Sequence, residues 1–174
     1  MLEKYSPQNP SRKVRMTLSF AFSAVPHVIA TYFGAGVLRP ASGTWGSLAA
    51  LLTYMALEAW IPALGWCALI ALAFFAGAWA CEVTGRDIGV HDHGSIVIDE
   101  VFAVWMVLLT VPSAWQWQVA AFLAFRFFDV VKIQPAKWFD TAECWHNGWG
   151  VMLDDAAAAV QSMLLLWLAQ VLLG

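Results

Sequence analysis

Five stretches of the sequence contain no Asp, Glu, Lys or Arg, and they restrict the fold more than any other feature. They are residues 16–38, 40–57, 59–81, 101–125 and 156–174. A helix needs about 20 apolar residues to cross a bilayer, and several of these stretches approach that length. The chain is 61% hydrophobic and 12% charged, whereas an ordinary soluble domain is about 25% charged. The sequence therefore predicts a membrane protein rather than a soluble bundle with an unusually apolar core.

Prolines indicate where helices begin and end within these stretches. Pro62 suits the first turn of a helix, and Pro112 interrupts the stretch 101–125 near its middle. No sustained period-2 alternation indicates strands. We therefore expect an all-α fold, a compact helical membrane bundle in which several helices are short or re-entrant. The expected helices are 48–60, 63–81, 101–111, 113–128 and 156–174.

The length of 174 residues predicts one domain, since two large domains need a longer chain. Residues 1–15 form a polar, basic N-terminal segment with four Lys or Arg residues, and residues 16–174 form a single helical domain. The net charge of −3 supplies no basic face for nucleic acid. We expect membrane lipids as partners, no nucleic acid, and no obligate protein partner.

The acidic residues gather in two segments of the chain. Of the twelve Asp and Glu residues, five lie in 82–100 and five more in 126–155. If the expected short helices pair as two successive hairpins, both segments reach the same side of the membrane. Lys and Arg beside short apolar segments favour the cytoplasm. We therefore expect a multi-pass protein whose polar chemistry lies at the cytoplasmic helix ends.

Asp99 and Glu100 stand directly before the uncharged stretch 101–125. Acids at a helix N-terminus are favoured by the helix dipole, and this alone explains one of them. Two carboxylates at the edge of hydrocarbon are costly unless a cation compensates them, and a divalent metal does so well. The pair is a candidate metal ligand set or a helix cap.

Arg126, Asp129 and Lys132 are spaced three residues apart in a mostly apolar segment. On a helix they fall within one polar stripe. The stripe is either an internal salt bridge or a phosphate clamp, Arg126 and Lys132, beside a metal ligand, Asp129. Arginine suits phosphate because its planar fork matches two oxygens.

Asp154 and Asp155 form a third acidic cluster before the apolar stretch 156–174. Adjacent helical residues point about 100° apart, so we expect the two to have different roles. Oxygen-rich sites of this kind suit Mg²⁺, which binds phosphate oxygens together with one or two carboxylates. The candidate metal ligands are Asp99, Glu100, Asp129, Asp154 and Asp155.

Two further segments allow two interpretations each. The glycine-rich stretch Ser42–Ser47, which includes Thr44, is either a phosphate-binding loop at the start of a helix or an ordinary turn with an N-cap serine. His91 and His93 flank Asp92 and form either a transition-metal site or a solvated loop.

Four motifs together resemble the phosphatidylglycerophosphatase A family. That family has a Gly-Thr-Trp-Gly-Ser stretch, an Ile-Val-x-Asp-Glu motif, a Phe-Arg-x-Phe-Asp-x-x-Lys-Pro-x-Pro motif and a Gly-Gly-x-Gly-x-Met-x-Asp-Asp motif. Here they stand as Gly43–Ser47, Ile96–Glu100, Phe125–Pro135 and Asn147–Asp155, in the same order. Two positions depart from the pattern, since Ile133 replaces a proline, which predicts a slightly longer helix, and Asn147 replaces a glycine.

The resemblance implies hydrolysis of phosphatidylglycerophosphate to phosphatidylglycerol and phosphate, with Mg²⁺, at the bacterial inner membrane. It implies substrate contacts from Thr44, Ser47, Arg126 and Lys132. The catalytic set that it implies comprises the two basic residues and the five candidate metal ligands, namely Asp99, Glu100, Arg126, Asp129, Lys132, Asp154 and Asp155.

A different class of function remains open as an alternative. A membrane ion carrier, or a non-catalytic membrane scaffold with an acidic rim, would also carry many acids. A carrier places ionisable groups in the middle of its spans. In this sequence Glu58 is the only single acid that separates two apolar stretches, and the other acids gather near expected helix ends.

Overall fold

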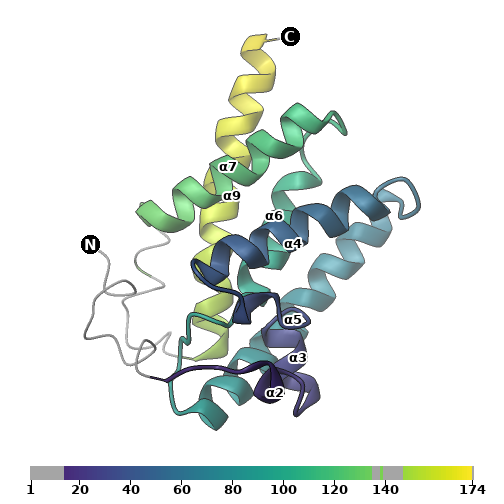
Figure 1. Cartoon of the computed structure of the whole chain (residues 1–174). Helices are drawn as coiled ribbons and strands as arrows, with labels where there is room; N and C mark the ends of the chain where they lie inside the picture. The colour runs from purple at the N-terminus through teal and green to yellow at the C-terminus, as the bar shows by residue number, and fades with distance from the viewer. Residues whose placement is uncertain (1–13, 135–137, 139–146, 174) are drawn as a thin grey trace.

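The computed structural model describes residues 14–134, 138 and 147–173 (Figure 1). Within these residues the chain forms seven α-helices and one 3-10 turn, and it forms no strand. The all-α fold predicted from the sequence is therefore confirmed. The elements are α2 (Leu18–Ala21), α3 (Val25–Ala30), η2 (Ala35–Val37), α4 (Ser42–Leu57), α5 (Ala63–Ile88), α6 (Ile98–Leu108), α7 (Trp115–Val131) and α9 (Gly148–Leu173).

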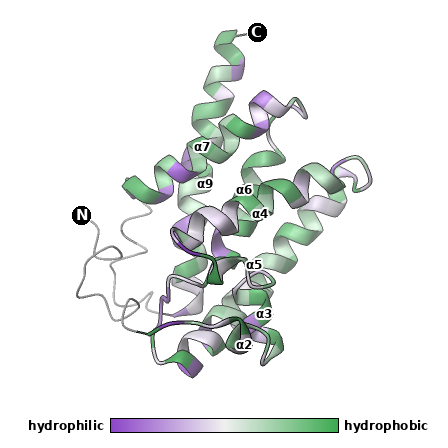
Figure 2. Ribbon diagram, viewed as in Figure 1, coloured by the Kyte–Doolittle hydropathy of each residue, from purple (hydrophilic) through white to green (hydrophobic). Residues whose placement is uncertain are grey.

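Two helices, α5 and α9, are long and apolar enough to cross a membrane. Each has 26 residues, about 39 Å at 1.5 Å per residue, against a hydrocarbon thickness of about 30 Å. Large apolar side chains project outward along both, and Figure 2 shows them as mostly hydrophobic ribbons. Among these exposed side chains are Leu64, Leu72, Phe75, Trp79, Leu164, Trp167, Leu168 and Val171. Soluble monomers rarely expose apolar surface on this scale.

Helix α6 lies at the centre of the fold and packs against α4, α5, α7 and α9. Every residue from Ile98 to Leu108 is buried except Met106. Trp105 donates a hydrogen bond to the Ala50 carbonyl of α4 and packs edge-on against Trp66 of α5. An 11-residue helix is about 16 Å long and does not cross a bilayer. Because neighbouring helices enclose it, its ends are shielded from lipid as a short helix requires.

The positions of the acids within the helices agree with the sequence prediction in one case and differ from it in another. Asp99 and Glu100 occupy the first turn of α6, as predicted. Helix α9, in contrast, begins at Gly148, so Asp154 and Asp155 lie inside it and the predicted start at residue 156 was wrong. The early start is stabilised by the Gly148 N–H, which donates to Glu82 Oε2 at 2.9 Å. Gly148 also packs on α5 so closely that a Cβ there would lie 2.0 Å from the Ala78 carbonyl oxygen.

The glycine-rich stretch is the first part of a helix, so its interpretation as an ordinary turn with an N-cap serine was wrong, while phosphate binding at this helix start stays a prediction. Helix α4 begins at Ser42, and the N-cap is Ala41 without a side-chain bond. The glycines are required by close packing rather than by a turn. A Cβ at Gly43 would lie 2.0 Å from Glu100 Oε1, and one at Gly46 would lie 2.6 Å from Val97 Cβ.

The first apolar stretch, 16–38, is divided into α2, α3 and η2 rather than forming one helix. Tyr32 and Phe33 have positive φ angles of 45° and 54°, and Gly34 follows at 85°, which ends α3 sharply. No single helix of this stretch is long enough to cross a bilayer. The predicted division at residue 15 stays a prediction, since most of 1–15 lies outside the described residues, as do Pro135, Asp140 and Glu143.

Candidate active site

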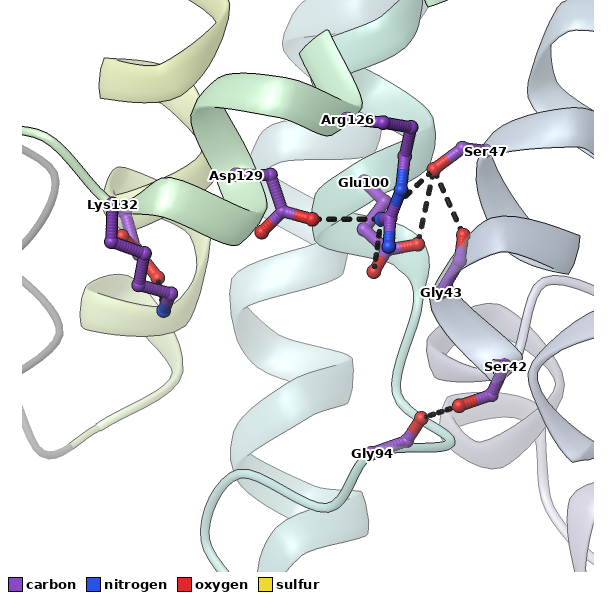
Figure 3. Close-up of polar contacts among 9 residues, drawn as sticks. Ser42, Gly43, Ser47, Gly94, Glu100, Arg126, Asp129 and Lys132 are labelled. Atoms are coloured by element: carbon purple, nitrogen blue, oxygen red, sulfur yellow. Dashed lines mark hydrogen bonds and ion pairs between the residues drawn. The ribbon is translucent and has the colours of Figure 1, made fainter. Parts of the chain in front are cut away.

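Arg126 is the central cation of a buried polar cluster. Its Nη1 atom lies 2.7 Å from Asp129 Oδ2 and 3.1 Å from Glu100 Oε1. Figure 3 shows the guanidinium between Asp129 on one side and Glu100 with Ser47 on the other. The side chains of Arg126, Glu100 and Asp129 are 15%, 5% and 7% exposed. Removing either carboxylate would leave the arginine's buried charge less compensated, so the three groups depend on one another.

Ser47 joins α4 to this cluster. Its hydroxyl donates to the Gly43 carbonyl at 2.8 Å, lies 3.2 Å from Glu100 Oε2, and accepts from Arg126 Nη1 at 3.4 Å. The absence of a side chain on Gly43 lets the Glu100 carboxylate approach the first turn of α4. Thr44, the other predicted substrate contact, is exposed on this turn, and its side chain forms no hydrogen bond within the described part of the chain.

Lys132 does not continue the polar stripe that the sequence predicted. Helix α7 ends at Val131, and Lys132 caps it in a left-handed conformation with φ of 48°. Its ammonium group instead pairs with Asp154 of α9. The predicted helix extension beyond residue 128 does occur, but it stops before Lys132 because this residue leaves the helical conformation. The two basic residues therefore contact different acids.

Asp155 lies among the other four predicted acids. The carboxylates of Asp129, Asp99, Asp154 and Glu100 all repel it. Asp155 is 2% exposed, and its Oδ2 atom has no hydrogen-bond partner among the residues that the structure describes. Since an unpartnered buried carboxylate oxygen is costly, this atom marks a place where a cation would be bound favourably.

The structure thus brings together all five predicted acids, from α6, α7 and α9, with two basic residues beside them. All five carboxylates are buried. Arg126 and Lys132 are the cations that pair with them in the described residues, so negative charge is in excess. No group of three or more His, Cys, Asp or Glu side chains in the described ranges is arranged to hold a metal ion by itself. The donor chemistry fits a hard divalent cation, while a complete protein-only coordination shell is not formed.

Two buried residues of α5, Cys81 and Thr84, were not among the site residues predicted from the sequence. The buried Cys81 of α5 lies within electrostatic range of Asp99, Asp92 and Asp155, so Asp92 belongs to the same acidic region. Thr84, one turn further along α5, is fully buried, and its hydroxyl has no hydrogen-bond partner within the described segments. The position of Asp92 in a histidine-rich loop was a visible signal, but no sequence pattern indicated Thr84.

His93 has a structural role. It is fully buried, its Nδ1 accepts from the Ser95 N–H at 3.1 Å, and its Nε2 therefore donates to the Val14 carbonyl at 2.9 Å. Burial lowers the pKa of His93 below its ordinary value of 6.5. Burial and the Ser95 N–H, which donates to Nδ1, favour the neutral ring, whereas His91 is exposed. Neither histidine belongs to a metal-binding group among the described residues.

Comparison with known proteins identifies one family. The sequence model of a family described as phosphatidylglycerophosphatase A matches residues 28–170. The phosphatidylglycerophosphatase A of Haemophilus influenzae is 43% identical over 145 residues, which cover 83% of this chain and 88% of that protein. The phosphatidylglycerophosphatase A of Escherichia coli is 40% identical over 137 residues, 78% of each chain.

A third relative carries a different name. A Bacteroides thetaiotaomicron protein, provisionally named a phosphatidylinositol-3-phosphatase, is 40% identical over 159 residues, or 87% of this chain and 98% of that protein. No solved structure matches the chain with significance.

Proposed function

Because the chain belongs to the phosphatidylglycerophosphatase A family, we propose that it hydrolyses phosphatidylglycerophosphate to phosphatidylglycerol and inorganic phosphate. The reaction breaks the bond between phosphorus and the terminal glycerol oxygen. Water supplies the new oxygen on phosphorus, and the leaving glycerol oxygen takes up a proton. The site residues must therefore bind a dianionic group, orient a water molecule and move a proton.

The observation that supports this proposal is the pairing of buried cations with an excess of buried carboxylates. Arg126 lies near the end of α7, 2.7 Å from Asp129, and Lys132 caps the same helix and pairs with Asp154. A phosphate group that replaces a carboxylate partner would gain charge-assisted hydrogen bonds from the same donors. Electrostatic stabilisation of this kind is usually the largest single contribution to phosphoryl transfer.

The excess of carboxylates also supports Mg²⁺ as cofactor. Mg²⁺ binds through one or two carboxylates together with waters and substrate phosphate oxygens, so it does not require three protein ligands in place beforehand. Asp155 and Asp99 are the carboxylates we propose to hold it, with Glu100, Asp129 and Asp154 as further candidates. When bound, the ion would neutralise phosphoryl oxygens and lower the pKa of a coordinated water.

We also propose that the protein crosses the cytoplasmic membrane of the bacterium several times and that the site faces the cytoplasm. The last turns of α5 are charged, with Glu82, Arg86 and Asp87, whereas its first five turns are apolar. Helix α9 starts at the same end, where Gly148 bonds to Glu82. The acids therefore lie near the polar ends of both candidate spans.

The provisional name of the Bacteroides relative raises a second substrate. Phosphatidylinositol 3-phosphate and phosphatidylglycerophosphate share a phosphate monoester on the headgroup of a diacyl lipid, and they differ in the group that leaves. The assay should therefore compare both lipids.

The test uses the purified chain in detergent and measures phosphate release. Release from phosphatidylglycerophosphate that requires Mg²⁺ and is lost on chelation is the expected result. Undiminished release in chelator would remove the metal from the proposal. A folded protein that releases no phosphate from either lipid would contradict the proposed function and favour the carrier or scaffold alternative.

A further inference from the structure

A group of exposed apolar side chains lies on the short helices α2 and α3 and the turn that follows them. We call this group the interfacial patch. Phe33 is 71% exposed and Val25 is 67% exposed. A Cβ at Gly34 would lie 3.2 Å from both Leu18 Cδ2 and Phe22 Cε2, so these two side chains meet at the glycine that follows Phe33. The interfacial patch consists of Leu18, Phe22, Val25, Phe33 and Leu38.

Residues 15–39 carry the patch. They extend from the charged end of α5 to α4 and α6. At the start of α3, His27 Nε2 lies 2.9 Å from Asp87 Oδ2, beyond the apolar part of α5. After α3, the Tyr32 hydroxyl donates to Thr53 of α4 at 2.8 Å, and the Tyr32 ring packs edge-on against Trp105. Figure 2 shows α2 and α3 at the end of the molecule where α5 terminates. The patch therefore lies beside the part of α5 where charged residues replace apolar ones.

Two cations flank the patch. Arg15 precedes α2 and Arg39 follows η2, both are exposed, and neither forms an ion pair with another described residue. Exposed apolar side chains between cations are typical of segments that lie in the plane of an anionic bilayer surface. Helices of four and six residues are too short to cross the bilayer, so lying in its surface is the arrangement they allow.

The same segment is joined directly to the candidate active site. The Val97 N–H, one residue before α6, donates to the Ala30 carbonyl at the end of α3 at 2.8 Å. The Ser42 hydroxyl, three residues after Arg39, donates to the Gly94 carbonyl. Whatever fixes the height of residues 15–39 in the membrane therefore also fixes the height of Asp99 and Ser47.

We propose that residues 15–39 form a platform that lies in an anionic lipid leaflet and holds the mouth of the acidic site at the level of lipid phosphates. The inference rests on the proposed function, because it explains how a site built for a lipid monoester meets its substrate. The apolar side chains of the patch contact acyl chains, and Arg15 and Arg39 contact anionic headgroups. The platform acts on access of the lipid and leaves the chemistry at the site unchanged.

The first test is independent of activity. A photoactivatable benzoylphenylalanine is placed at Phe33 and, in a control variant, at Arg86, whose side chain is 71% exposed at the end of α5. Both proteins are irradiated in nanodiscs of phosphatidylethanolamine and phosphatidylglycerol and analysed by mass spectrometry. Lipid adducts are expected at residue 33 in clear excess over residue 86. Equal yields, or fewer adducts at residue 33, would overturn the proposal.

The second test separates access from chemistry. Phe33→Ser should raise the KM for phosphatidylglycerophosphate in vesicles roughly tenfold, because an apolar contact with lipid is lost. Its kcat, and its turnover of a monomeric short-chain analogue, should not change. Leu64→Ser, at the other end of α5 with 81% exposure, serves as the matched control and should keep the wild-type KM. An unchanged KM for Phe33→Ser, or an equal loss on the short-chain analogue, would overturn the platform.

The headgroup contact is tested with lipid composition. Arg39→Gln should raise the KM about fivefold in vesicles that contain phosphatidylglycerol and leave it unchanged in phosphatidylcholine vesicles. An equal rise in KM in both kinds of vesicle would contradict contact with anionic headgroups. Wild-type protein that turns over neither long-chain nor short-chain substrate would refute the proposed function, while the photochemical test would still decide the platform.

Discussion

Arg126 and Glu100 are in contact across α7 and α6, with Nη1 and Oε1 at 3.1 Å, although the two residues are far apart in the sequence. The same nitrogen also contacts Asp129, at 2.7 Å. The guanidinium is thus a structural link between helices, and in the proposed function it also binds the phosphate group. Substitution of Arg126 by lysine and by alanine separates the phosphate-binding role from the structural one.

Arg126→Lys should keep a cation between Glu100 and Asp129 but lose the planar fork that binds two phosphate oxygens. We expect phosphate release to fall roughly 100-fold or more, with little change in thermal unfolding. Arg126→Ala should also lose about 3–5 kcal/mol of stability, because two buried carboxylates lose their cation. Arg86→Lys, at an exposed position, is the control for a conservative change. Wild-type turnover in Arg126→Lys would remove bidentate binding from the mechanism.

Gly43→Ala tests whether the approach of Glu100 to α4 matters. The added Cβ would lie 2.0 Å from Glu100 Oε1, so the carboxylate must move away from Ser47 and Arg126. We expect lower activity and a loss of about 1–3 kcal/mol in unfolding free energy. Gly94→Ala is the matched control, since the nearest atom to its Cβ would be Ser42 Oγ at 4.0 Å. Equal behaviour of the two variants would show that the close contact is unimportant.

Asp154 and Asp155 are adjacent in sequence but have different neighbours, which predicts different responses to the same change. Asp155→Asn removes a carboxylate that four others repel, so stability should hold while the Mg²⁺ concentration for half-maximal activity rises about tenfold or more. Asp154→Asn removes the partner of Lys132, so kcat and stability should fall with an unchanged Mg²⁺ requirement. Titrating activity and thermal unfolding against Mg²⁺ measures both. A raised Mg²⁺ requirement in Asp154→Asn but not in Asp155→Asn would make Asp154 the metal ligand instead. An unchanged Mg²⁺ requirement in both variants would exclude Asp155 as a ligand.

Because His93 is buried, we expect the free energy of unfolding to depend on pH. Its folded-state pKa is lowered by burial, so below the unfolded value of 6.5 the unfolded chain binds a proton that the folded chain does not. The contribution of the neutral, buried His93 to the free energy of unfolding is complete above pH 6.5 and is lost as the pH falls below that value. The wild type should therefore lose stability between about pH 8 and pH 5 more steeply than His93→Gln, measured by thermal unfolding. Parallel curves for the two proteins would show that His93 does not titrate differently on folding.

The boundaries that could be predicted were those that charge or proline marks. Ala63 follows Pro62 and begins α5, and Asp99 with Glu100 opens α6, because the change from polar to apolar residues is visible in the sequence. The starts of α4 and α9 were missed, since glycines at 43, 46, 148 and 150 favour turns by local preference. In the folded protein, contacts from distant helices override that preference.

The sequence indicated which residues form the candidate site, but it did not indicate which of them pair with one another. Acids at helix ends indicated which carboxylates meet. That Lys132 would leave the helix and pair with Asp154 was not predictable, because a lysine rarely adopts a positive φ without tertiary contacts. Contacts such as that between Arg126 and Glu100 depend on how α6 and α7 pack, and no local pattern records this.

The backbone contact between Gly148 and Ala78 has a consequence for how this site can vary. Asp154 and Asp155 lie about 10 Å along α9 from that contact, on a rigid helix that is seated on α5 at its first residue. Any side chain at position 148 would lift that end of the helix and displace both aspartates together. The position of both aspartates thus depends on a residue that has no side chain. A substitution at position 148 can therefore change the geometry of the site without altering any of its acids.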